Sequence, residues 1–257
     1  NNYIKQVVID EAQDYMAGKS TKMGIDERNL SYDYKEILKL EHINVKGIHV
    51  FSASGIMNYE ALIRYVNYVF DLVQRIENAF HTNIDVIDFG GGLGIDYSGR
   101  DDKFNVRQYF KLLEDLIKAF KFDNKELIME LGTFLVGNAG YYTAKVIDIK
   151  ESKGKKHMIL AGGVNHSGLQ LEMQRKHPVC ILSMNEPDVY RGQPSINNEL
   201  CDISGPCCMC NDILSWDTFI NNARIGDICI FLQSGAYCYE EAMINFLSHP
   251  EPYRFTV

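Results

Sequence analysis

The 257-residue sequence has an ordinary globular composition, and its charge and apolar pattern argue against two classes of partner. Hydrophobic residues make up 46% and charged residues 23%, a balance that permits a sizeable core. The formal net charge is -8, whereas a nucleic-acid surface needs clustered Lys and Arg. No apolar run reaches the length that spans a bilayer, and the first residues do not form a signal peptide. The sequence therefore predicts neither a nucleic acid nor a membrane as partner.

The cysteines indicate a reducing, cytoplasmic setting. There are seven of them, an odd number scattered through a chain that is too long to need a disulfide framework. Cys207, Cys208 and Cys210 could suggest a metal site. A structural zinc site usually pairs two such hairpins, and here Cys201 is the only further cysteine nearby. The sequence predicts no metal site.

The first half of the chain alternates strand and helix patterns. Apolar residues recur at the helical period between short β-rich runs. The expected elements are, in order, a strand over 47–52, a helix over 58–80, a strand over 85–89, a helix over 105–120 and a strand over 126–131. Strands joined by long helices pair in parallel through crossovers.

The pattern changes near residue 140. Short β-rich runs are now separated by clusters of Gly, Pro, Asn and Ser, with no long helical pattern. The expected strands are 141–149, 158–160, 179–183 and 227–231, with a polar hairpin turn at Lys150 to Lys156. The predicted domains are therefore an α/β domain over 1–139 and a mostly β domain over 140–257.

Polar residues stand at the ends of the three predicted parallel strands. The first strand ends in His49 and Ser52, the second in three consecutive glycines, and the third in Glu130. The carboxyl ends of barrel strands meet at one rim, where active sites gather. Glycines at such a position let backbone amides approach an anion closely. The sequence predicts a site at this rim.

Five motifs in this order resemble those of a known family. They are Gly47-Ile-His-Val-Phe-Ser52, Asp88-Phe-Gly-Gly-Gly92, Glu130-Leu-Gly-Thr133, Gly205-Pro-Cys-Cys208 and Gly235-Ala-Tyr237. Together they resemble the pyridoxal-phosphate-dependent decarboxylases that act on ornithine, arginine, diaminopimelate and related substrates. The resemblance runs from about residue 23 to residue 250. It implies the C-terminal part of a (β/α)8 cofactor-binding barrel, followed by a mostly β domain.

The resemblance also implies roles for the residues at the barrel rim. His49 is expected to stack on the cofactor ring, and Ser52, Gly91 and Gly92 to contact its phosphate. Glu130 is expected to face the ring nitrogen and, as a nearby negative charge, to keep it protonated. Racemases of the family place a cation there, so Glu130 favours decarboxylation.

Further roles implied by the resemblance fall on the rest of the chain. Gly132 and Thr133 are expected beside the cofactor, and Tyr237 at its phosphate. Cys208 resembles the cysteine that reaches across a homodimer interface into the partner's site and protonates the product carbon. Met209 is expected to contact the amino-acid substrate.

The chain departs from the family at three positions. Thr133 replaces an arginine that would clamp the phosphate through two hydrogen bonds. Met209 stands where an acidic residue reads the far ammonium group of the substrate, and a thioether cannot pair with an ammonium. Ala161 also stands where an acidic residue is common. These departures suggest weaker cofactor binding and a substrate without a free distal ammonium, such as an amino-acid conjugate.

The lysine that binds the cofactor covalently in this family is not recognisable. About three strand–helix units precede the β domain, whereas a closed barrel needs eight, so we expect an N-terminal part to be missing. The expected function is decarboxylation of an amino acid or its conjugate. Phe246 to Pro250 weakly resembles family members that act in siderophore or antibiotic metabolism, which suggests that setting. The alternatives are a non-catalytic homologue that acts through dimerisation, an amino-acid racemase, and a cofactor carrier, a class that lacks the β domain.

Overall fold

The structure is a computed structural model that divides into two compact units. It describes residues 14–15, 22–100, 102–168, 176–184 and 192–256. The first unit comprises residues 1–95 and 102–134, and the second comprises residues 96–101 and 135–257. The domain limit at residue 139 stays a prediction. No helix among the described residues is both long enough and apolar enough to cross a membrane.

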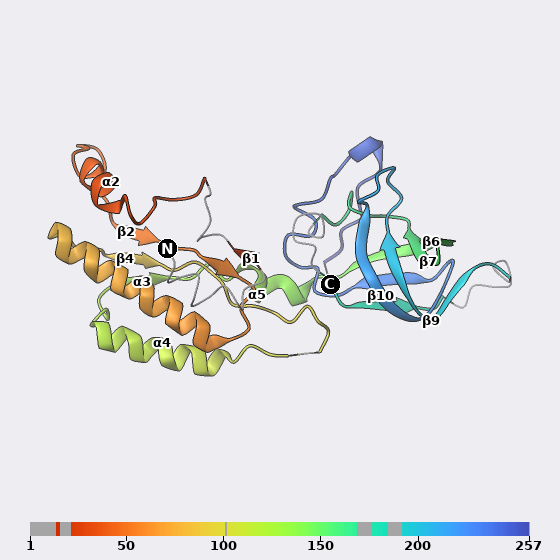
Figure 1. The fold of residues 1–257 in the computed structure, drawn as a ribbon, viewed down its shortest axis with the longest axis horizontal. Coiled ribbons are helices and arrows are strands. Elements are labelled where there is room, and N and C mark those ends of the chain that lie inside the picture. The colour runs from red at the N-terminus through yellow and green to blue at the C-terminus, as the bar shows by residue number, and fades with distance from the viewer. Residues whose placement is uncertain (1–13, 16–21, 101, 169–175, 185–191, 257) are drawn as a thin grey trace. The chain divides into compact units, whose positions relative to one another are not determined.

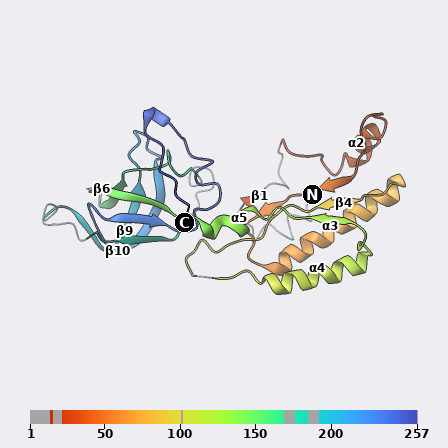
Figure 2. The same cartoon turned by 180° about the vertical axis from the view of Figure 1, so that it is seen from behind.

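The first unit contains a three-stranded parallel sheet with two long helices. Its elements are β1 (Asp14–Tyr15), α2 (Leu30–Ile37), β2 (Gly47–His49), β3 (Ala53–Ser54), α3 (Tyr59–Phe80), β4 (Val86–Asp88), α4 (Val106–Phe120) and β5 (Glu126–Ile128). The sheet order is β2-β4-β5, and both pairings are parallel. Helices α3 and α4 lie side by side below the strands as drawn (Figure 1), and the reverse view agrees (Figure 2). Each helix is the crossover that a parallel pair of strands requires.

Local signals explain where α3 begins and ends. The Asn58 side chain accepts hydrogen bonds from the backbone N–H groups of Glu60 and Ala61, which satisfies donors that the first helical turn leaves free. At the other end, His81 adopts a left-handed conformation with φ 51° and stops the helix. The buried side of α3 carries Val66, Val69, Phe70 and Val73 among others, so its apolar face anchors the core of this unit.

The second unit is built around a six-stranded sheet. Its strands are β6 (Tyr142–Ser152), β7 (Lys155–Leu160), β8 (Val179–Leu182), β9 (Ser195–Ser204), β10 (Ile213–Arg224) and β11 (Ile228–Phe231), in the order β10-β9-β7-β6-β11-β8. Strands β7 and β9 pair in parallel, and the other neighbours are antiparallel. The short helices are α5 (Gly132–Val136), η1 (Gly137–Ala139) and η3 (Phe246–Ser248). The expected hairpin turn is confirmed at Lys153 and Gly154, where both residues have positive φ.

The sequence patterns missed two long strands, β9 and β10. Asn197 and Asn198 are poor strand formers, and Asn198 has a positive φ of 51°. In β10 the register shifts between Ser215 and Thr218, and such a bulge breaks the alternation that marks a strand. The predicted strand over 47–52 is also shorter: β2 ends at His49, and the next strand, β3, begins at Ala53 and pairs with β1.

A buried ion pair ties the end of α3 to the start of β5. The Lys125 Nζ lies 2.7 Å from the Glu77 Oε1, and these side chains are 6% and 20% exposed. The same ammonium donates to the Ile84 carbonyl, and the same carboxylate accepts from the Ile84 N–H. The pair therefore satisfies the backbone of the chain segment that enters β4.

We predict that Lys125→Ala lowers the free energy of unfolding by about 3 kcal/mol, because removing one partner leaves a buried charge uncompensated. The control is Lys118→Ala, which breaks the exposed Lys118–Glu114 pair on α4 and should change stability little. Urea denaturation of both variants measures the difference. Equal effects would contradict the structural role of the Lys125–Glu77 pair.

Candidate active site

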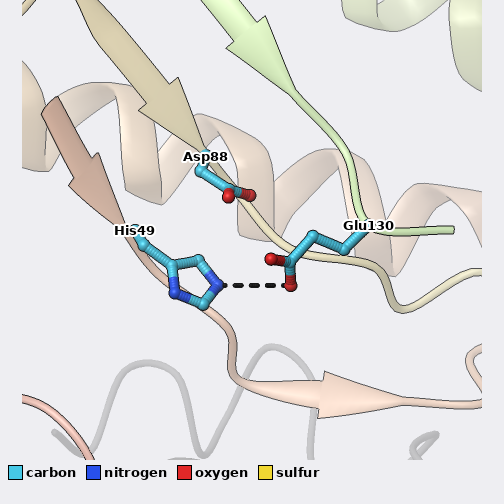
Figure 3. A group of neighbouring side chains, drawn as sticks. All are labelled: His49, Asp88 and Glu130. Carbon is cyan, nitrogen blue, oxygen red and sulfur yellow. Dashed lines mark ion pairs between the residues drawn. The ribbon is translucent and has the colours of Figure 1, made fainter. Parts of the chain in front are cut away.

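The three parallel strands end beside one another and bring three polar side chains together. His49 ends β2 and is the register partner of Asp88 at the end of β4, which in turn pairs with Ile128 of β5. Two residues after β5, Glu130 extends toward the imidazole of His49 (Figure 3). The His49 Nε2 and Glu130 Oε2 atoms are 3.5 Å apart, and both side chains are about half exposed. The predicted proximity of His49 and Glu130 is therefore present in this unit.

Asp88 is a third member that the sequence analysis did not single out. One ligand-type atom of each of His49, Asp88 and Glu130 lies within 4.8 Å of the other two. Asp88 also accepts a hydrogen bond from the Gly90 N–H at 2.9 Å. Its place two residues before the first glycine, at the end of the predicted strand, was the signal that could have found it. Among the described residues, the cysteines of the 207–210 segment form no comparable group of possible metal ligands.

The glycines after β4 are required by close approach to the neighbouring strand ends. A Cβ atom on Gly91 would lie 2.4 Å from the Glu130 carbonyl oxygen, which no real side chain tolerates. Gly90 and Gly92 have positive φ values of 68° and 106°, a conformation that glycine adopts at little cost. The Gly90 carbonyl accepts from the Glu130 N–H at 2.8 Å, so the loop and Glu130 are fixed to each other.

Three hydrogen-bond donors at or near this loop have no acceptor among the described residues. Within the part of the chain that the structure describes, the N–H groups of Gly91 and Gly92 donate to no protein atom. The Ser52 hydroxyl is buried and also has no hydrogen-bond partner there. Ser52 precedes Ala53, whose carbonyl oxygen would lie 3.2 Å from a Cβ on Gly92. Unfilled donors of this kind are rare in native proteins and call for an explanation.

The phenol of Tyr65 lies near Ser52 and uses its own proton for the backbone. Burial raises the pKa of the Tyr65 phenol above its ordinary value, so this group stays protonated. It donates its proton to the Val50 carbonyl at 2.5 Å. The Ser52 hydroxyl and the two glycine amides thus fit a bound oxyanion such as a phosphate, and the carboxylate of Glu130 fits a protonated ring nitrogen.

Gly132 and Thr133 lie next to Glu130 along the chain. The Gly132 N–H donates to the Glu130 carbonyl at 2.9 Å, and this turn leads into α5. Thr133 is half-buried in the first turn of α5. The structure places both residues beside Glu130 and shows no contact that assigns either of them a role.

The remaining predicted site residues belong to the second unit and are placed within that unit alone. Cys208 is exposed, whereas its neighbour Cys207 is buried, and burial raises the pKa of Cys207 to about 11. Met209 is half-buried and packs against the core of the second unit. Tyr237 is 46% exposed and sits in a turn with a positive φ of 65°.

The chain is similar to known decarboxylases. Residues 5–137 match the family model described as pyridoxal-dependent decarboxylase, pyridoxal binding domain. A curated relative from Staphylococcus aureus, 2-[(L-alanin-3-ylcarbamoyl)methyl]-2-hydroxybutanedioate decarboxylase, is 27% identical over 93% of this chain and 60% of its own length. The L-glutamyl-[BtrI acyl-carrier protein] decarboxylase of Niallia circulans is 26% identical over 92% of this chain and 56% of its own length.

Solved structures agree with the fold expected from the sequence. The crystal structure of a protein from Aquifex aeolicus matches with a TM-score of 0.75 and 26% identity, over 90% of this chain and 54% of that chain. The predicted fold class, the C-terminal part of a (β/α)8 barrel followed by a mostly β domain, is confirmed. The chain spans about half to three-fifths of the length of these relatives.

We predict that Ser52→Ala separates folding from cofactor binding. Without ligand, the free energy of unfolding should stay equal or rise by about 1 kcal/mol, because a buried hydroxyl without a partner is removed. The increase in the free energy of unfolding that pyridoxal phosphate causes should be smaller than in the wild-type protein, because a ligand that binds more weakly stabilises the folded state less. Urea denaturation of the complete protein with and without pyridoxal phosphate measures both changes.

The matched control for this experiment is Ser54→Ala, two residues further along the same segment. It should leave the stabilisation by pyridoxal phosphate unchanged. Equal stabilisation of the Ser52→Ala and wild-type proteins by the cofactor would contradict a phosphate site at Ser52.

Proposed function

The chain belongs to the pyridoxal-dependent decarboxylase family, and on that premise we propose that the complete protein is a carboxy-lyase acting on an amino acid or an amino-acid conjugate. The observation that carries the proposal is the His49–Glu130 pair beside a glycine loop with unfilled donors. An imidazole, a carboxylate and unfilled donors at the ends of adjacent parallel strands are the kinds of group that would hold the ring and the phosphate of this family's cofactor.

The residues that would hold pyridoxal phosphate follow from the site. Ser52, Gly91 and Gly92 would donate to the phosphate, His49 would lie against a ring face, and Glu130 would accept a hydrogen bond from the ring nitrogen. When bound, the protonated cofactor ring supplies an electron sink for the charge left on carbon as CO₂ departs. Gly132, Thr133 and Tyr237 remain proposed neighbours of the cofactor, Thr133 replacing the arginine usual in the family.

Glu130 and Cys208 have complementary tasks in this proposal. The carboxylate of Glu130 would keep a proton on the ring nitrogen by favouring its charged form. The exposed thiol of Cys208 would deliver a proton to the carbon that has lost its carboxylate, which is general acid catalysis. The carboxylate at position 130 favours this outcome over racemisation.

The substrate proposal rests on Met209 and on the relatives. A thioether offers an apolar surface and only a weak acceptor, and leaving an ammonium unpaired against it would be costly. The two curated relatives are named for an L-alanine moiety carried on a hydroxybutanedioate and for an L-glutamyl group on an acyl-carrier protein. We therefore propose a conjugated amino acid, with siderophore or other secondary metabolism as the setting.

The lysine that binds the cofactor is proposed to come from sequence outside residues 1–257. Lys46 and Lys125 precede β2 and β5 and so lie at the opposite strand ends from Glu130. Lys125 is also engaged in the buried pair with Glu77. Lys5 and Lys19 fall outside the described residues.

A non-catalytic homologue is the second candidate function. Thr133 and Ala161 favour it, because each replaces a charged residue that is common in the family. Glu130 and Cys208 oppose it, since a protein that only dimerises has no use for either group. The seven cysteines are all unpaired, which supports a cytoplasmic, reducing setting for either function.

The test of the enzyme proposal is Glu130→Ala in the complete protein. Turnover should fall far more than cofactor occupancy, because the electron sink is weakened while the phosphate contacts remain. Decarboxylation assays and absorbance titration with pyridoxal phosphate measure the two quantities. Unchanged turnover in the variant would refute the assignment of Glu130, and absence of any decarboxylation in the wild-type protein would favour the non-catalytic homologue.

We also propose a homodimer whose active sites are shared, as the family resemblance of Cys208 implies. Subunits inactivated at Glu130 and at Cys208 should regain about a quarter of the activity when mixed, because random pairing gives one intact site in half of the dimers. Native mass spectrometry confirms subunit exchange. No recovery after exchange would show that each site is built within one chain.

A further inference from the structure

A buried carboxylate lies at the base of the loop that carries Cys208. Asp212 is 2% exposed and lies just before β10. Its Oδ1 accepts from the Val164 N–H at 2.8 Å, and its Oδ2 accepts from the Cys207 N–H at 2.7 Å. Each carboxylate oxygen therefore holds the backbone of a different segment: the turn after β7 and the cysteine loop between β9 and β10.

The surrounding backbone is shaped to admit this carboxylate. A Cβ atom on Gly163 would lie 2.2 Å from the Asp212 Oδ1, and a Cβ on Gly205 would lie 2.4 Å from either carboxylate oxygen. The Gly205 N–H donates to the Asp212 carbonyl at 2.9 Å. The two glycines leave room for the charged group, and no other residue type would fit at either place without displacing it.

Backbone amides are the partners of this charge. Within the described ranges, Asp212 takes part in no ion pair with Lys, Arg or His. Hydrogen bonds from N–H groups to a carboxylate are charge-assisted and are about twice as strong as neutral ones. A buried carboxylate satisfied in this way fixes its donors, because losing either bond leaves the charge short of solvation.

The hydrogen bonds around Asp212 give the two neighbouring cysteine thiols different environments. The Cys207 Sγ points toward the Asn165 Oδ1 at 3.5 Å, and the same amide oxygen accepts from the Gly163 N–H at 3.0 Å. Burial, with the Asp212 charge nearby, raises the pKa of Cys207 to about 11. Cys207 is thus held inside and protonated, while Cys208 is left exposed at the adjacent position.

We propose that Asp212 is a positioning residue that fixes the cysteine loop, holding Cys207 inside and presenting Cys208 to the reaction. This inference rests on the proposed function of Cys208 as proton donor. Asp212 touches neither substrate nor cofactor in this role, and it acts through the backbone of Cys207.

The test compares thiol reactivity in the complete protein. In Asp212→Asn, the side-chain NH₂ replaces one of the two accepting oxygens and faces a backbone N–H. The substitution therefore removes one hydrogen bond and sets two donors against each other. Alkylation by iodoacetamide, followed by peptide mass spectrometry, should show Cys207 labelled at least about tenfold faster, as an unsatisfied buried donor favours local opening. In the assay kcat should fall while KM and the cofactor absorbance stay unchanged.

The matched control is Asp202→Asn, a buried carboxylate in β9 that accepts from the Asp217 N–H and pairs with Lys155. It should lower stability without changing the labelling of Cys207. An Asp212→Asn protein that folds and labels Cys207 at the wild-type rate would overturn the proposal. If labelling changes but kcat does not, the positioning role stands and the proton-donor role of Cys208 is wrong.

A measurement on the unmodified protein covers the case in which Asp212→Asn fails to fold. The amides of Val164 and Cys207 lie outside the strands, yet they should be protected in hydrogen–deuterium exchange like strand amides. Exchange of both at the rate of exposed loop amides would refute the role of Asp212 without any variant.

Discussion

The site in the first unit depends on the absence of a side chain at Gly91, in the loop that follows β4. The backbone of Gly91 lies so near the Glu130 carbonyl that a Cβ atom would come within 2.4 Å of it. This contact brings Glu130 to the end of β4 and sets its carboxylate opposite His49. In the same loop, the N–H groups of Gly91 and Gly92 donate to no acceptor among the described residues. The carboxylate–imidazole pair and the unfilled donors therefore lie around one closely packed glycine loop.

The elements of the first unit could be predicted from the sequence because their signals are local. Helix α3 has an apolar face at the helical period and a capping Asn58, and the predicted span of 58–80 matches Tyr59–Phe80. Strands β9 and β10 could not be found in this way. Their polar residues and the register shift at Ser215 are tolerated because neighbouring strands supply the pairing, and that context is absent from a local pattern.

The site could be predicted in part for a similar reason. His49 and Glu130 end parallel strands, and topology alone brings such ends together. Asp212 escaped notice because its importance comes from backbone N–H groups at Val164 and Cys207. The first of these is 48 positions away in the chain. A sequence pattern shows which side chains are present but not which distant amides a carboxylate will meet.

The two carboxylates illustrate how the fold distributes hydrogen bonds between stability and function. Asp212 is buried, and each of its carboxylate oxygens accepts a hydrogen bond from a backbone N–H. Both oxygens are therefore used to hold the cysteine loop in place. Glu130 is half exposed, and its 3.5 Å contact with His49 is worth little in water. It can therefore exchange that partner for a ligand at small cost, and the Ser52 hydroxyl, which has no hydrogen-bond partner among the described residues, is equally available. The groups proposed to bind the cofactor, Glu130 and Ser52, make few hydrogen bonds within the protein. Asp212, which is proposed to position other residues, uses both of its oxygens in such bonds.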